Sequence, residues 1–384
     1  MGAQRIANFG TTVFSEITRR AVATGAVNLA QGYPDFDGPD FVKEAAIRAI
    51  RDGHGQYARM SGLPVLNAAI AAHDHHHHGL SLDPDSEVTV TSGATEGIAD
   101  AILALVNPGD EVILFEPFYD SYRAAIELAG GVAVAVPLRP PTWTFDPDQL
   151  AAAFTHRTRV LLLNTPHNPT GHVTTAAELD IIETLVLRHG VVLLSDEVYE
   201  HLVYVGRHET PLARPALRDR TIRLTSLGKT FSLTGWKVGW AVASPPLTTA
   251  LRAVHQFVTF ATSTPFQVAA AVALAAPDAW FDDLRRGYNN RRDLLCAGLE
   301  SVGFEVHRPD GAYFVCAGFS RMGWTDDRAA VDALLNLGVA TIPPSAFFLR
   351  GAATTYVRFA FCKQDATLNA ALERLVPLRS LSGA

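Results

Sequence analysis

The sequence has little cysteine and little charge for its length. Its 384 residues include three cysteines, and 18% are charged, with a formal net charge of −7. Cys296, Cys316 and Cys362 lie in apolar surroundings without metal-ligand spacing, which is typical of reduced, buried thiols in a cytoplasmic protein. An acidic chain also lacks the basic face that a nucleic-acid-binding surface requires. We therefore expect a cytoplasmic protein without a nucleic-acid partner.

Long hydrophobic runs are absent as well. The opening stretch, MGAQRIANFGTTVF, lacks the charged region and following apolar run of a signal peptide. No apolar segment reaches the roughly 20 residues that a membrane-spanning helix needs. Hydrophobic residues nevertheless make up 48% of the chain, which favours a folded protein with a sizeable core over a disordered one. These features predict a globular protein without a membrane partner.

A histidine-rich stretch, AAHDHHHHGL, places His73 and His75–His78 near the end of a helical segment. Successive positions of a helix point to different faces, so we expect these side chains not to converge on one metal ion. Imidazole groups near a helix C-terminus are favourable in their own right. The sequence therefore predicts a solvated helix end and no functional metal site.

Short apolar runs alternate with helical segments through the first two thirds of the chain. Such alternation indicates an α/β fold with a mostly parallel sheet covered by helices on both faces. We predict a large domain over residues 45–285, and a smaller α+β domain made of residues 1–44 and 286–384. Seven strands are expected in the large domain, at residues 87–92, 111–117, 132–138, 159–166, 191–197, 221–227 and 239–244.

Polar groups suited to a phosphate lie at the ends of two of these expected strands, residues 87–92 and 221–227, and just before the strand at 239–244. Ligands of open α/β sheets bind at the carboxyl ends of the strands. Gly93, Ala94 and Thr95 begin a helix, where backbone N–H groups and a threonine hydroxyl can hold a phosphate. Ser226 and Lys237 can add a hydroxyl and a positive charge to the same site.

Other strand-end residues suit an aromatic aldehyde. Asp196 can pair with a protonated ring nitrogen, and Asn168 and Tyr199 can form hydrogen bonds with a phenolic oxygen. Tyr119 can stack on a flat ring, and Lys229 can form a Schiff base with an aldehyde. The ligand that combines a phosphate, a basic aromatic ring, a phenolic oxygen and an aldehyde is pyridoxal 5′-phosphate.

Seven motifs that run along nearly the whole chain carry a family resemblance. In order they are NLAQGYPDF, TSGATEG, NPGDEVILFEPFYDSY, NTPHNPTG, SDEVYEHLVY, SLGKTFSLTGWKVGW and YVRFAFCK. The chain resembles the fold-type I pyridoxal-phosphate enzymes, specifically the class I/II aminotransferases. Within that family it is most similar to the subgroup of kynurenine, glutamine, methionine and succinyldiaminopimelate aminotransferases.

The resemblance implies a role for each matching position. Lys229 would carry the cofactor, Asp196 would bind the ring nitrogen, and Asn168 and Tyr199 would bind the ring oxygen. The phosphate would be held by the group formed by Ala94, Thr95, Ser226 and Lys237. Many family members have arginine where Lys237 stands, and lysine supplies the charge without the forked hydrogen bonds.

The resemblance also implies a partner subunit and a substrate-binding end. Tyr57 matches a tyrosine that reaches the phosphate of the neighbouring subunit, which implies a homodimer. Arg358 would grip the substrate α-carboxylate as a bidentate fork, and the backbone N–H of Gly32 would lie against it. The family places substrate-pocket aromatic residues at Phe14, Tyr33, Phe260 and Phe347.

These aromatic positions favour a substrate with an apolar or aromatic side chain, such as methionine, phenylalanine or kynurenine. The predicted function is transfer of the amino group of an L-amino acid to a 2-oxo acid, with Lys229 as the general base and Asp196 and Tyr199 as its catalytic partners. A carbon–sulfur β-lyase on the same fold is the alternative, because it needs the same lysine and the same aromatic ring. Formation of pyruvate and ammonia from a cysteine conjugate without an oxo acid would distinguish the lyase.

Overall fold

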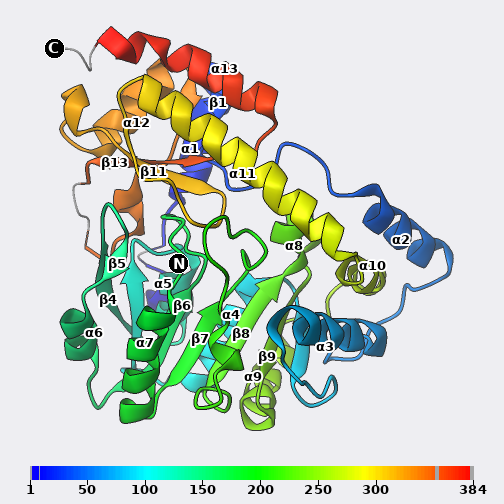
Figure 1. Cartoon of the computed structure of the whole chain (residues 1–384). Helices are drawn as coiled ribbons and strands as arrows, with labels where there is room; N and C mark the ends of the chain where they lie inside the picture. Colours follow the sequence, from blue (N-terminus) through cyan, green and yellow to red (C-terminus); the bar gives the residue numbers. More distant parts are fainter. Residues whose placement is uncertain (1, 8, 351–353, 381–384) are drawn as a thin grey trace.

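A large mixed sheet forms the centre of the molecule (Figure 1). The computed structural model describes residues 2–7, 9–350 and 354–380. The order of the strands across the sheet is β2-β9-β8-β7-β6-β3-β4-β5. The five strands from β8 to β4 are parallel, whereas β9 is antiparallel to both of its neighbours and β5 is antiparallel to β4. In this order the strands are Val88–Thr91, Gly239–Ala243, Thr221–Ser226, Val192–Asp196, Thr158–Asn164, Glu111–Glu116, Val132–Arg139 and Thr144–Phe145.

Alternating side chains of the central strands enter two different cores. In β3, Val112 and Leu114 pack against helices on one face, while Ile113 and Phe115 join a separate cluster on the other face. Since successive residues of a strand point to opposite faces, continuous apolar runs such as these fit a sheet buried on both sides. One face is covered by α4 (Ala94–Leu105), α5 (Ser121–Leu128) and α9 (Pro245–Val258), and the other by α6 (Pro147–Ala153) and α7 (Ala176–His189).

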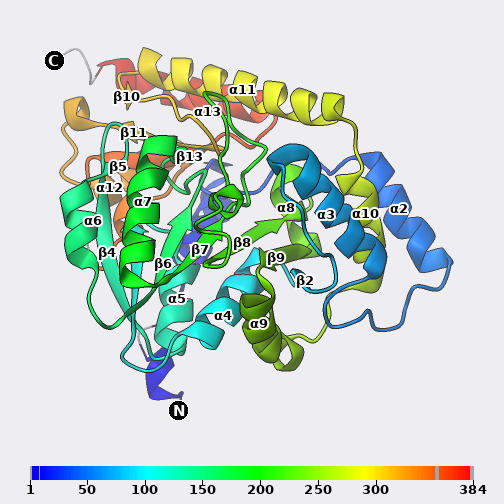
Figure 2. The same cartoon turned by 60° about the horizontal axis from the view of Figure 1, so that its bottom comes forward.

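Three helices pack together at the β2 edge of the sheet, visible at the right of Figures 1 and 2. They are α2 (Asp40–Arg51), α3 (Pro64–His78) and α10 (Thr264–Leu274). Their apolar residues form a cluster with Val88, Val90 and Trp240 of the edge strands. A short helix, α8 (Leu227–Thr230), follows β8 directly.

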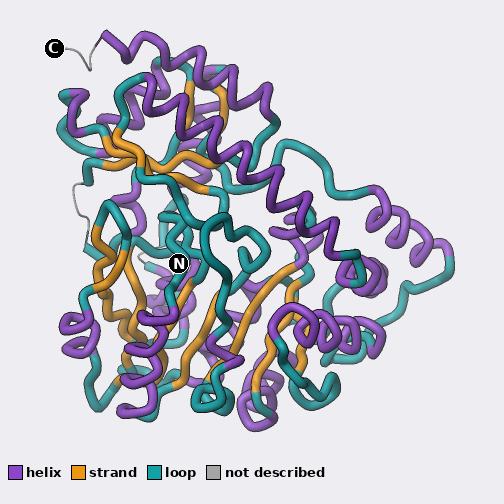
Figure 3. Tube along the Cα trace, in the orientation of Figure 1, coloured by secondary structure: helices purple, strands orange, loops and turns teal. Residues whose placement is uncertain are grey.

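A second group of strands lies apart from the large sheet, as the strand colouring of Figure 3 shows. Strands β10 (Glu305–Val306), β11 (Phe314–Gly318) and β13 (Tyr356–Ala360) form an antiparallel sheet, and β1 (Val27–Asn28) pairs in parallel with β12 (Val339–Ala340). The helices of this region are α1 (Val13–Thr24), α11 (Asp278–Ser301), α12 (Asp327–Asn336) and α13 (Asp365–Leu375). Within the described part of the chain, every helix is too short or too polar to span a bilayer.

The predicted α/β class and all seven predicted strands are confirmed. The sheet has an eighth strand that the sequence did not predict, because β5 is only two residues long and carries no readable periodicity. The predicted division at residues 44/45 and 285/286 falls inside α2 and α11, and it stays a prediction. One hydrophobic core continues across it, since Leu194 of β7 and Tyr288 of α11 belong to the same cluster.

The histidine run departs from the solvated helix end that its sequence predicts. His75 and His76 are exposed, but His73 is 4% exposed and His78 contacts the buried carboxylate of Glu200 at 2.6 Å. The reason is tertiary packing: the last turns of α3 lie against the segment that follows β7, which a local pattern does not reveal.

Candidate active site

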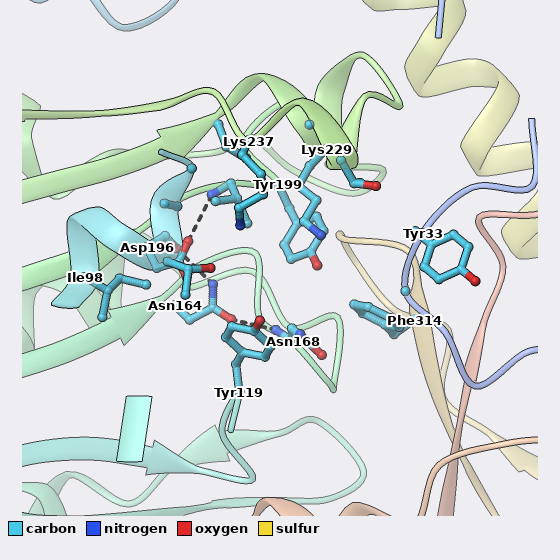
Figure 4. A pocket seen from close by; sticks show the side chains of 18 of the residues that line it. Tyr33, Ile98, Tyr119, Asn164, Asn168, Asp196, Tyr199, Lys229, Lys237 and Phe314 are labelled. Atoms are coloured by element: carbon cyan, nitrogen blue, oxygen red, sulfur yellow. Dashed lines mark hydrogen bonds between the residues drawn. The ribbon is translucent and has the colours of Figure 1, made fainter. Parts of the chain in front are cut away.

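A cavity of about 230 Å³ lies at the carboxyl ends of the parallel strands, and its side chains converge on one space (Figure 4). Strands β6, β7 and β8, the start of α4 and residues from β11 and β13 all contribute to its walls. The candidate residues that line it are Phe14, Gly32, Tyr33, Gly93, Ala94, Thr95, Tyr119, Asn168, Asp196, Tyr199, Ser226, Lys229, Lys237 and Arg358. Residues far apart in the sequence are therefore brought together. This agrees with the strand-end rule, by which ligands of open α/β sheets bind at the carboxyl ends of the strands.

The start of α4 forms one end of the cavity. No side chain caps this helix, so the N–H groups of its first turn are free to bind an anion. Gly93 has φ +78°, a conformation that favours glycine, and a Cβ atom there would lie 3.1 Å from the amine of Lys237. Gly239 of β9 permits the close approach, because a Cβ atom on it would lie 2.6 Å from the backbone nitrogen of Ala94. The result is a concave anion site with a lysine beside it.

Asp196 ends β7 in the floor of the cavity, with its carboxylate held on both oxygens. The hydroxyl of Tyr122 donates to Oδ2 at 2.6 Å, and the backbone N–H of Val198 donates to Oδ1 at 3.3 Å. Burial raises the pKa of Asp196 to about 6, although both of these hydrogen bonds act to lower it. A buried carboxylate in this state strongly favours a cationic partner in the cavity.

Lys229 extends into the cavity from α8, directly after β8 (Figure 4). Its Nζ lies 5.9 Å from the ring centres of Tyr199 and Tyr313. Burial lowers its pKa, and the positive charges of Lys237 and Arg358 act in the same direction. A lysine that loses its proton more easily is a better nucleophile and base.

Arg358 closes the opposite end of the cavity from β13. It is 1% exposed; its Nη1 donates to the side-chain oxygen of Asn168 at 3.0 Å, and its Nη2 donates to the carbonyl of Ala30 at 2.5 Å. Its guanidinium carbon lies 4.3 Å from the ring centre of Phe314 and 5.2 Å from that of Phe14. The Nε atom is buried without a hydrogen-bond partner in the described protein. The guanidinium group is therefore held in place, and its Nε–H can still donate a hydrogen bond to a ligand.

Three candidate residues do not line this cavity in the single chain. Tyr57 is 86% exposed and Phe260 is 42% exposed, and their rings contact each other edge to face at 5.6 Å. Phe347 is buried behind the wall, where it packs against Phe14 at 5.7 Å. Phe347 therefore supports the wall, and the first two residues face outward from this chain.

Several cavity residues were missed or left open by the sequence analysis. Tyr122 comes three residues after Tyr119, so helical spacing could have placed it near the same site. Asn164 is the last residue of β6, and its side chain donates to the backbone carbonyl of Asp196 at 2.9 Å. The strand-end rule applies to Asn164 as it does to Asp196. Phe314 is an apolar residue in an apolar strand and gives no local signal.

Comparisons with known proteins agree with this geometry. A family model described as aminotransferase class I and II matches residues 24–375. The chain is 45% identical to the probable N-succinyldiaminopimelate aminotransferase DapC of Mycobacterium tuberculosis over 98% of both chains. It is 40% identical to the methionine aminotransferase of Escherichia coli over 97% of both chains. The solved structure of N-succinyldiaminopimelate aminotransferase from Mycobacterium tuberculosis superposes with a TM-score of 0.95 at 45% identity, covering 98% of this chain and 100% of that one.

These matches confirm the family, the subgroup and the fold type that the seven sequence motifs indicated. The family is pyridoxal-phosphate-dependent, which also confirms the predicted cofactor. The chain belongs to the class I and II aminotransferases, enzymes that move an amino group between amino acids and 2-oxo acids.

Proposed function

We propose that this aminotransferase acts on L-amino acids with apolar or aromatic side chains. We also propose that the cavity residues bind the cofactor at one end and the substrate carboxylate at the other. The observation that carries the substrate class is the charge of the walls around Arg358. Among the described residues that line the cavity, Arg358 is the single arginine, and the two lysines lie at the cofactor end. A second, distal carboxylate on the substrate has no arginine there to pair with, whereas Phe14, Tyr33 and Phe314 offer apolar surface.

The cavity fits pyridoxal phosphate on three independent features. The uncapped start of α4 beside Lys237 fits a phosphate, the buried Asp196 fits a cationic ring nitrogen, and the half-buried Lys229 fits an aldehyde. When bound, the cofactor supplies an aldehyde carbon that receives the amino group and an aromatic ring that delocalises the electron pair left on the substrate Cα.

The roles of the chain's own residues at that ring follow from their environments. With the cofactor bound, Lys229 Nζ would take the proton from the substrate Cα and would deliver it to the carbon that carried the aldehyde. Asp196 keeps the ring nitrogen protonated, and Tyr122 and Val198 hold its carboxylate in place. Tyr199 donates a hydrogen bond to the ring oxygen, since burial raises its pKa and keeps the phenol protonated.

At the substrate end, Arg358 binds the α-carboxylate. Its unpaired Nε and its fixed orientation on Asn168 suit a planar, bidentate contact. Gly32 lies in the same cavity wall, and its carbonyl accepts a hydrogen bond from the hydroxyl of Tyr313 at 2.6 Å. We assign the backbone N–H of Gly32 to the substrate carboxylate. A side chain on Gly32 would lie 2.7 Å from the ring of Phe314, so the chain approaches the carboxylate closely only with glycine here.

We further propose a cytoplasmic homodimer in which Tyr57 reaches the phosphate of the partner subunit. Support comes from the exposed apolar side chains of Tyr57, Phe257, Val258 and Phe260. Several exposed apolar side chains close together indicate an interaction surface, whereas a single one does not. The three free cysteines are buried, which fits a reducing compartment.

The test is a substrate panel followed by visible absorbance. Single amino acids are added to the holoenzyme without an oxo acid, and conversion of the cofactor to its amino form is recorded. Methionine, phenylalanine and kynurenine are expected to convert it, and aspartate is expected to do so at least about 100-fold more slowly, as an unpaired buried charge would dictate. A faster conversion with aspartate or N-succinyldiaminopimelate than with these three would overturn the proposed class.

The same experiment separates the β-lyase on this fold. A cysteine conjugate that yields pyruvate and ammonia while the cofactor band stays unchanged would identify elimination as the main activity. Conversion of the band without pyruvate is the result expected of amino-group transfer.

A further inference from the structure

Three histidine rings meet outside the active site. His73 and His77 stand one turn apart on α3, and His201 approaches them from the segment after β7. The ring centres lie 4.3 Å apart for His73 and His77, and 5.0 Å apart from His201 in both cases. The Nε2 atoms of His73 and His201 face each other at 2.9 Å. Two imidazoles in this contact share one hydrogen between two nitrogens.

The positions of the ring nitrogens match what a metal ion requires. One nitrogen from each of the three rings lies within 4.8 Å of the other two. Tetrahedral coordination with zinc–nitrogen distances of about 2.0–2.1 Å separates neighbouring nitrogens by about 3.4 Å. The cluster therefore needs only small ring rotations, which lengthen the contact between His73 and His201 and draw His77 inward. A metal ion would then lie between the ring nitrogens, and the hydrogen that the two Nε2 atoms share would move to the Nδ1 atom of its ring.

The surroundings of the cluster provide a floor and an entrance. Phe281 packs against all three rings, at 5.6 Å from His73, 5.1 Å from His77 and 4.6 Å from His201. A cavity of about 370 Å³ is lined by His73, His77 and residues of the loop before α11. An ion can enter from there, and water in that cavity can supply a fourth ligand. An apolar wall behind the ligands and an open position in front describe a typical imidazole site.

We propose that His73, His77 and His201 bind one divalent transition-metal ion of the zinc, nickel or cobalt type. Imidazole is a favoured ligand of these metals, and calcium and magnesium prefer oxygen ligands. The sequence alone predicts no such site, because neighbouring histidines of a helix point to different faces. The i, i+4 pair of His73 and His77 shares a face, and its third ligand comes from 124 positions further along the chain.

The bound ion would fix the segment that carries Tyr199. His201 follows Tyr199 by two residues, and Glu200 between them is held by Arg223 and by the hydroxyl of Thr225. The ion would tie this segment to α3 by coordination bonds, in addition to the contact of His78 with Glu200. Because it binds the folded state, the ion is expected to raise the unfolding temperature.

The experiment uses tag-free holoenzyme that has been stripped with a chelator and dialysed. Zinc binding is titrated by calorimetry, and cobalt binding is followed by visible absorbance at wavelengths beyond the cofactor band. We expect one ion per chain, a cobalt spectrum typical of tetrahedral nitrogen coordination, and an unfolding temperature that rises with zinc and falls again with chelator.

Variants locate the ion. His77→Ala and His201→Gln are each expected to weaken zinc binding by at least about 10- to 100-fold, the loss that removing even a supporting group causes. His75→Ala removes an exposed histidine of the same run and is expected to leave affinity unchanged. The cofactor band and circular dichroism check that each variant is folded.

His76→Ala tests the neighbouring group of His76, His77 and Asp278 on the surface. Loss of binding in His76→Ala with full binding in His201→Gln would place the ion at the surface and overturn the proposal. Equal, weak binding by every variant, including His75→Ala, would overturn it too, because the run would then bind metal without a defined site. A folded His201→Asn protein serves as the second reading if His201→Gln does not fold.

Discussion

The hydroxyl of Tyr122 adjusts the charge of the carboxylate at the centre of the active site. Asp196 is buried, and burial alone would push its proton affinity well up, which would weaken its pairing with a ring cation. The short hydrogen bond from Tyr122 counters part of that effect. One phenol thus keeps Asp196 ionised over more of the pH range.

Tyr122→Phe is expected to move the acid limb of the pH profile of kcat/KM upward. Without the donor, the pKa of Asp196 rises further above its ordinary value, by about 0.5–1 unit for a hydrogen bond worth about 1 kcal/mol. The measurement is kcat/KM between pH 5 and 9 with a saturating oxo acid. Tyr204→Phe, which changes a phenol outside the cavity, should leave the limb in place. An unshifted limb in Tyr122→Phe would show that the hydroxyl does not control the charge of Asp196.

At the scale of secondary-structure elements, the positions of the strands could be predicted from the sequence. The side-chain contacts between different elements could not. Runs such as residues 159–166 and 191–197 predict buried strands because they are apolar and β-branched, and the strand-end rule then located Asp196. Nothing local predicts that Arg223, in the apolar-looking stretch TIRLTSL, is fully buried. Its partners come from α3 and from the segment after β7, so only the folded topology assembles them.

Arg223 joins β8 to α3 and to the segment after β7. Its guanidinium bonds Asp74 and Glu197 at 2.9 Å, and it also pairs with Glu200; all of these side chains are buried. Arg223→Leu removes the guanidinium from three buried carboxylates, of which Glu197 and Glu200 each keep a histidine contact. We expect the substitution to lower the free energy of unfolding by at least about 3–5 kcal/mol. Chemical denaturation of the holoenzyme measures this loss.

The matched control for Arg223 is Arg207→Leu. Arg207 forms a surface ion pair with Glu209 and its side chain is 83% exposed. Its replacement should change the free energy of unfolding by less than about 0.5 kcal/mol. Similar losses of unfolding free energy in both variants would mean that burial of Arg223 does not increase its contribution to stability.

A buried charge also joins α4 to α9. His255 of α9 contacts Glu96 at 2.8 Å and Asp100 at 3.4 Å on α4, the helix that begins at the phosphate end of the cavity. Burial disfavours the imidazolium, but the hydrogen bonds that His255 donates to these two carboxylates outweigh this effect and raise the pKa of His255 to about 9. A raised histidine pKa contributes stability that is complete below pH 6.5 and is lost as the pH rises through 9.

We therefore expect the unfolding temperature of the wild-type holoenzyme to fall between pH 6.5 and 9.5 more steeply than that of His255→Gln. The variant should start lower at pH 6.5 and approach the wild type at pH 9.5, because both then lack the charge. Calorimetric melts across this range provide the comparison. Parallel curves for the two proteins would contradict the assignment of the charge to His255.

At the scale of the whole molecule, an exposed aromatic surface contrasts with a well-buried core. Tyr57 is 86% exposed and Phe257 85% exposed, although aromatic rings of this size usually lie inside or at an interface. The resemblance to the family assigned Tyr57 to the partner's cofactor, and no contact within one chain could have revealed that. In the proposed homodimer a second chain would complete the site, and the contacts of one chain do not reveal that contribution.

Light scattering is expected to give a mass of twice the 41.4 kDa of one chain. Tyr57→Phe should keep this mass while raising the dissociation constant of pyridoxal phosphate about 10- to 100-fold, as loss of a hydrogen bond to a charged group does. Equilibrium dialysis measures the cofactor. Tyr356→Phe, on β13 and away from the cavity, should retain wild-type affinity. A monomer, or unchanged affinity in Tyr57→Phe, would contradict the shared site.

The pairing of β1 with β12 has a consequence for biosynthesis. Residues 27–28 pair with residues 339–340, and the carbonyl of Ala30 accepts a hydrogen bond from Arg358. The early segment therefore lacks these partners until the ribosome has synthesised more than 300 further residues. At about 5–20 residues per second, that wait is tens of seconds on the ribosome. The parallel strands can assemble meanwhile, but the end of the cavity proposed to bind the substrate carboxylate forms only after Arg358 has left the exit tunnel. Nascent chains can therefore form the proposed phosphate site and place Lys229 beside it well before the proposed substrate-binding end exists.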